Sequence, residues 1–138
     1  MAALLALALA ACGEDSGNQN ADVASAISIL DNAGMHEIDE SVNTKKEIPP
    51  TAQNTALHMQ TVVLVTEWPS DLKSPAKKMA DLFGKMAETL DSPQPDMAKV
   101  GPAVKAAHDA WHDFSEAVWE HLAGEAGLKG AAGGSHGH

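Results

Sequence analysis

The sequence predicts an all-α protein that folds as an antiparallel four-helix bundle with up-down-up-down order. Apolar residues recur at spacings of three and four, strand-type alternation is almost absent, and proline-rich segments separate the periodic stretches. Four amphipathic helices with short connections cannot bury their apolar stripes alone, and an antiparallel bundle is the simplest joint solution. A chain of 138 residues, 44% of them hydrophobic, is expected to form one domain.

The first two helices are predicted on either side of the segment KKEIPP. The first covers residues 21–43 and has a weak point at 32–34, where Asn, Ala and Gly follow one another. The second begins after two prolines, with Thr51 as N-cap, and ends at Trp68-Pro69. Their predicted core positions are Val23, Ile27, Leu30, Met35, Ile38, Val42, Ala52, Ala56, Met59 and Val63.

The last two helices are predicted on either side of the segment DSPQPD. Ser74 is the expected N-cap of the third, with Pro75 in its first turn, and Gly101-Pro102 is expected to kink the start of the fourth. Their apolar stripes run through Leu72, Ala76, Met79, Phe83, Met86 and Leu90, and through Met97, Val100, Val104, Ala107, Trp111, Phe114 and Val118.

The N-terminal segment has the profile of a signal peptide. Its apolar run is too short to span a bilayer and ends at Leu9-Ala10-Ala11-Cys12, which resembles a bacterial lipobox. The resemblance implies cleavage before Cys12, attachment of lipid to Cys12, and a membrane-anchored protein of the bacterial cell envelope. No Lys or Arg precedes the run, so we expect the signal to begin upstream of Met1. The predicted organisation is signal peptide (1–11), lipidated Cys and linker (12–20), bundle (21–126) and a Gly/His tail without a core pattern (127–138).

Charge and composition disfavour two classes of function. A formal net charge of −10, with 9 basic against 19 acidic residues, disfavours nucleic acid as a partner. An enzyme is also disfavoured, because no serine lies in a nucleophile-elbow context and Cys12, which is the only cysteine, is expected to be acylated. Glu116 and Glu120 lie on the predicted outer side of the last helix, where carboxylates are normally solvated.

The segment VKAAHDAWHDF carries two histidines on one side of the last predicted helix. His108 lies beside the apolar seam and His112 one turn further on, so one metal ion could bridge them, with Glu116 a further turn along the same line. An ordinary polar flank would produce the same spacing. Further histidines that could bind copper, nickel or zinc are His36, within an acidic segment, and His136 and His138 in the tail.

The same segment resembles the last helix of cytochrome c prime. Val104 and Ala107 stand where that family has its two haem-attaching cysteines, and His108 stands where it has the axial histidine. Residues 74–111 resemble its third helix and the following loop, and GMHEIDESV is similar to the first helix of the soluble b-type bundle cytochrome, where Met35 matches an axial methionine. Without the cysteines, the resemblance implies non-covalent haem b, with His108 as ligand and Met35 as a candidate sixth ligand; matching the aromatic-histidine pair instead would select His112.

Three interpretations follow from the sequence. The protein is a haem-binding electron carrier or gas-binding module, a copper-, nickel- or zinc-binding envelope protein, or a cofactor-free bundle that binds a protein partner. In the last case His108 would be a hydrogen-bonded flank, and Trp68, Trp111 and Trp119 would be core or interface anchors. By analogy with cytochrome c prime, a homodimer is expected, with the apolar segment VVLV (62–65) as a candidate interface. The redox or envelope partner is not indicated.

Overall fold

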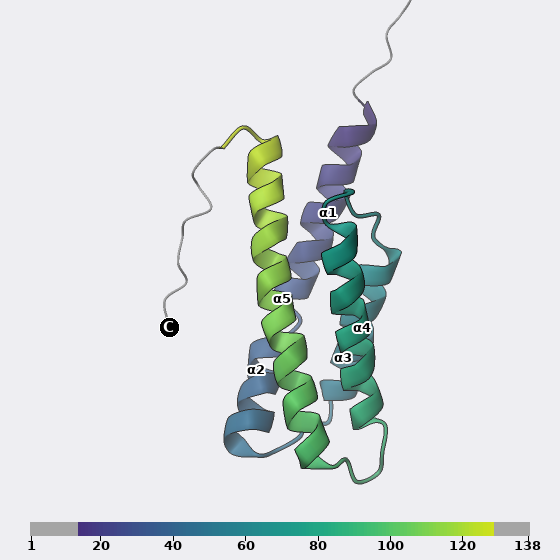
Figure 1. The fold of residues 1–138 in the computed structure, drawn as a ribbon, viewed down its shortest axis with the longest axis vertical. Helices are drawn as coiled ribbons and strands as arrows, with labels where there is room; N and C mark the ends of the chain where they lie inside the picture. The colour runs from purple at the N-terminus through teal and green to yellow at the C-terminus, as the bar shows by residue number, and fades with distance from the viewer. Residues whose placement is uncertain (1–13, 129–138) are drawn as a thin grey trace, which may run out of the picture.

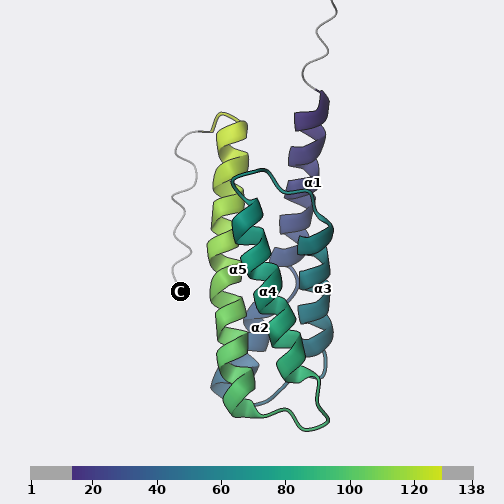
Figure 2. The same ribbon diagram turned by 45° about the vertical axis from the view of Figure 1, so that its right-hand side comes forward.

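The computed structural model describes residues 14–128, and over this range the chain is helical without strands. Its elements are α1 (Glu14–Asp31), α2 (Met35–Asp39), the π-helix η1 (Glu40–Lys45), α3 (Ala52–Val65), α4 (Lys73–Leu90) and α5 (Met97–Glu125). The long helices lie side by side along the long axis of the molecule, with α2 and η1 against the part of α5 nearest its N-terminus (Figures 1 and 2). The predicted all-helical class is therefore confirmed for the described range.

The first predicted helix is divided at its weak point. Gly34 has a φ of 82°, a left-handed conformation that glycine adopts without steric cost, and α1 ends three residues before it. After this break α2 begins at Met35 and continues without interruption into η1. Residues 35–45 thus form a short helical segment of their own.

Two helix starts differ from the prediction. Helix α1 begins at Glu14, so residues 14–20, which were assigned to the linker, are helical. Helix α4 begins at Lys73 after Leu72 in the N-cap position, where no side chain caps the helix, so Ser74 lies inside the helix rather than at its N-cap. The Pro69 carbonyl accepts from the backbone N–H of both Leu72 and Lys73, which satisfies two donors at this end without a side-chain cap. Thr51 does occupy the N-cap position of α3, again without a side-chain bond.

One apolar core runs through the bundle. The predicted seam of α5 is buried throughout its central part, and Phe83 of α4 and Met59 of α3 are fully buried. Trp68 is buried and donates from Nε1 to the Val63 carbonyl at 2.8 Å, which ties the loop after α3 to the end of that helix. Pro102 is accommodated inside α5.

The remaining tryptophans differ in their surroundings. Trp111 is buried, whereas the side chain of Trp119 is 45% exposed and donates from Nε1 to Asp31 Oδ2 at 3.0 Å. Ser115 donates to the other oxygen of Asp31 at 2.8 Å. Asp31 therefore links the end of α1 to α5 by two hydrogen bonds to a charged acceptor, the stronger class of side-chain bond.

Only part of the segment 62–65 is buried in the core. Val63 is buried, but Leu64 and Val65 are 66% and 76% exposed at the end of α3. The homodimer through this segment stays a prediction, which a mass measurement in solution would test.

Among the helices of residues 14–128, none combines the length and the apolar character needed to cross a membrane.

Candidate metal centre

Helix α5 presents His108 and His112 on one side, at its boundary with α2. The side chain of His108 is 16% exposed and lies between the buried seam residues Ala107 and Trp111 in sequence. His112 is four positions further along the helix and more exposed. This spacing brings the two imidazole rings to a centroid distance of 4.6 Å, as expected for residues one turn apart.

Helix α2 supplies the third histidine, His36. Its position follows from the chain break at Gly34 and from a contact further along the same segment, where Asn43 of η1 donates to the Gly101 carbonyl of α5 at 3.3 Å. A Cβ at Gly101 would lie 3.0 Å from the side-chain oxygen of Asn43, so the glycine permits this close approach. The segment 35–45 is thereby held against α5 on the C-terminal side of His36.

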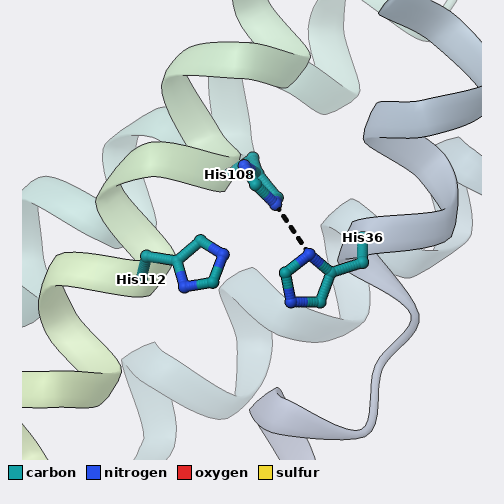
Figure 3. A group of neighbouring side chains, drawn as sticks. All are labelled: His36, His108 and His112. Carbon is teal, nitrogen blue, oxygen red and sulfur yellow. Dashed lines mark hydrogen bonds between the residues drawn. The ribbon is translucent and has the colours of Figure 1, made fainter. Parts of the chain in front are cut away.

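The three side chains converge on one small region, which we call the histidine cluster (His36, His108 and His112). Figure 3 shows the two rings from α5 and the ring from α2 directed toward one another. His108 Nε2 and His36 Nδ1 are 3.0 Å apart, and one nitrogen of each ring can be chosen so that all three lie within 4.8 Å of one another. The ring centroids of His36 and His112 are 4.8 Å apart.

Trp111 lies between the histidine cluster and the core. Its ring centroid lies 4.9 Å from that of His36, in an edge-to-face arrangement, and 4.5 Å from that of His112. Trp111 is only 4% exposed, so its own position is fixed by the core. A buried aromatic side chain thus lies against two of the three imidazoles.

The surroundings of His112 favour its neutral imidazole form. Burial lowers the pKa of His112 below the ordinary 6.5, and the neighbouring positive charges that His108 and His36 carry when protonated lower it further, against the attraction of Asp109 and Asp113. Neutral imidazole is the form that binds metal ions. At neutral pH His112 is therefore available as a ligand.

Asp109 lies next to the histidine cluster but is engaged elsewhere. Lys105 donates to both oxygens of Asp109 at 2.8 and 2.9 Å, and this hydrogen bond is the main reason that the pKa of Asp109 is lowered. Asp109 Oδ1 is also 3.7 Å from Nδ1 of His108, the nitrogen that does not face His36. Asp109 thus lies on the far side of the His108 ring, the place where carboxylates orient metal-ligating histidines.

The structure groups the candidate residues differently from the sequence. It brings His108 and His112 together as their spacing predicts, but the third donor in the group is His36 rather than Glu116, which is exposed. Met35, the candidate sixth haem ligand, is buried in the core at 1% exposure, and its neighbour His36 is the residue that contacts His108. Cys12, His136 and His138 lie outside the described residues.

No family model, curated protein or solved structure matches this chain.

Proposed function

We propose that the protein binds a divalent transition-metal ion through His36, His108 and His112. The observation that carries the proposal is the convergence of three ring nitrogens, from two segments far apart in the sequence, within 4.8 Å of one another. Imidazole is a good ligand for zinc, copper and nickel, so the donor set fits these ions. The net charge of −10 adds a general attraction for cations.

The geometry needs only a small adjustment to hold an ion. Two nitrogens bound to zinc at about 2.0–2.1 Å in a tetrahedral arrangement lie roughly 3.3 Å apart. The nitrogens of His108 and His36 are already 3.0 Å apart, and the remaining separations must close from at most 4.8 Å. Rotation of an exposed imidazole such as His112 can supply that change at little cost in packing.

Haem b is the weaker candidate for the same residues. His108 Nε2, the atom that would bind iron, faces His36 Nδ1 at 3.0 Å, and Trp111 packs against His36 beside it. A porphyrin bound to His108 would have to displace both contacts. A change in the Soret band when haemin is added, abolished by His108→Ala, would favour haem over the metal ion.

The structural setting that we propose is the one expected from the sequence. The bundle has up-down-up-down order and is similar to cytochrome c prime, but His108 binds a metal ion instead of haem. The lipobox-like segment ending at Cys12 supports a lipoprotein of the bacterial cell envelope, with the histidine cluster carried on a membrane-anchored domain. Mass spectrometry of the protein from its native membrane would reveal the lipid on Cys12.

Titration of the full chain with cobalt(II), followed by absorbance, tests metal binding. We expect one equivalent to bind with the spectrum of a nitrogen-ligated ion, and zinc to displace it. Replacement of His36, His108 or His112 by asparagine should each weaken binding strongly. Two controls separate this site from other histidines: His58→Ala on α3, and a His136→Ala/His138→Ala double variant. Tight binding that survives the cluster variants but is lost in the tail variant would contradict the proposal.

A further inference from the structure

The histidine cluster offers three protein donors, and the described carboxylates do not supply a fourth. The group of donor atoms that converges here consists of the three histidines. The nearest carboxylate to His108, that of Asp109, is bound to Lys105 and lies by the opposite ring nitrogen. Zinc takes four ligands in structural sites, and nickel and copper commonly take four or more. Within the part of the chain that the structure describes, an ion held by this cluster therefore has at least one coordination position that no His, Cys, Asp or Glu side chain fills.

Among the described residues, the histidine cluster lies between the core and the surface of the bundle. Trp111 covers the side of the core and contacts the rings of His36 and His112. His36 and His112 are themselves exposed, and His108 is partly exposed. An ion between them lies at the surface of the bundle, and the remaining coordination position is on the side of the solvent.

We propose that the metal ion held by the histidine cluster binds an exogenous monodentate ligand at this open position, where water is replaced by a small anion or by an imidazole. The inference rests on the proposed metal site and deepens it. Structural zinc sites are closed by four protein ligands, whereas three protein ligands and one exchangeable position are typical of sites whose metal interacts with other molecules. The histidine cluster is then an exchange site. A molecule that delivers the metal to the protein, or takes it away, can bind the ion before the histidines release it.

The test uses the full chain loaded with one equivalent of cobalt(II) and titrated with sodium azide. We expect a saturable change in the cobalt absorption spectrum that fits one azide per metal, while the cobalt remains with the protein after desalting. Imidazole should give a second, distinct spectrum and compete with azide. The His58→Ala variant, which retains all three cluster histidines, should behave as the parent chain does.

The outcomes separate this inference from the proposed function. Failure to bind cobalt in one equivalent would overturn both. One-to-one binding of cobalt with a spectrum that azide and imidazole leave unchanged would leave the metal site in place and overturn the open position. Release of the metal by azide without a spectrum of the mixed complex would also overturn it, because no ternary complex then forms.

Discussion

Replacement of His36 by asparagine should uncouple the metal ion from the thermal stability of the protein. His36 is the only cluster ligand outside α5, and it lies 72 positions before His108 in the chain. A metal ion that binds both residues stabilises the native state and requires the two segments to be in place. With two histidines one turn apart remaining, the variant can bind the ion only through α5, which needs no contact with α2.

The magnitude follows from the size of the described domain. Free zinc at 100 times its dissociation constant stabilises the native state by about 2.7 kcal/mol. The unfolding entropy at about 2.1 cal/mol/K per residue is roughly 240 cal/mol/K for the approximately 115 residues of the range 14–128. The expected rise in melting temperature is therefore about 11 °C. A 100-fold loss of affinity at the same zinc concentration would leave about 0.4 kcal/mol, or roughly 2 °C.

Thermal unfolding followed by circular dichroism, with zinc and with a chelator, measures both shifts. Because His36 contacts His108 and Trp111, its replacement can lower the melting temperature by itself, so each zinc-dependent shift is measured against the same variant in chelator. The matched control His58→Ala removes another exposed histidine from α3 and should keep the full zinc-dependent shift. An equal zinc-dependent shift in the parent chain and in His36→Asn would refute the role of His36 as a ligand.

The remaining predictions concern pH and packing. Because the pKa of His112 is lowered in the native state, the unfolded state takes up a proton at this residue first as the pH falls through 6.5. The free energy of unfolding should therefore fall as the pH decreases from 6.5, and it should fall less in His112→Asn. Urea unfolding at several pH values measures both, and an equal dependence on pH in the parent chain and the variant would contradict the burial of this ring. Asp31→Ala removes the acceptor shared by Ser115 and Trp119 and should cost about 1–3 kcal/mol, more than Ser115→Ala, in the same assay. Phe83→Ala should cost about 3–5 kcal/mol because the ring is fully buried, and a cost below 1 kcal/mol would show that the core is packed differently.

Much of the fold could be predicted because helical periodicity is a local property of the sequence. The apolar stripe of α5 predicted its buried face, and the Asn-Ala-Gly segment predicted the break before α2. The start of α4 was misplaced, since a Ser-Pro pair is a common N-cap signal but backbone donors here bond to the Pro69 carbonyl. The π-helix η1 carries no local signal of this kind, and its Asn43 donates to the Gly101 carbonyl of α5, a contact between segments far apart in the sequence.

The candidate site could be predicted only in part. The i, i+4 spacing of His108 and His112 lies within one helix and can be derived from the sequence, but the pairing of His36 with them depends on how α2 packs against α5. The line from His112 to Glu116 follows the same helix away from α2, which explains why sequence spacing favoured a ligand that the structure leaves outside the cluster. His36 did stand out in the sequence as a histidine within an acidic segment, but not as a partner of His108 and His112.

X-ray absorption at the zinc edge of the zinc-loaded full chain tests the central claim most directly, because it counts the imidazole ligands on the ion. We expect about three imidazole nitrogens at about 2.0–2.1 Å, with the rest of the coordination shell made of oxygen. His36→Asn should reduce the count to about two, and His58→Ala should leave it unchanged. A shell made mainly of carboxylate and water oxygens, or an imidazole count that His36→Asn does not change, would contradict a metal site shared by α2 and α5.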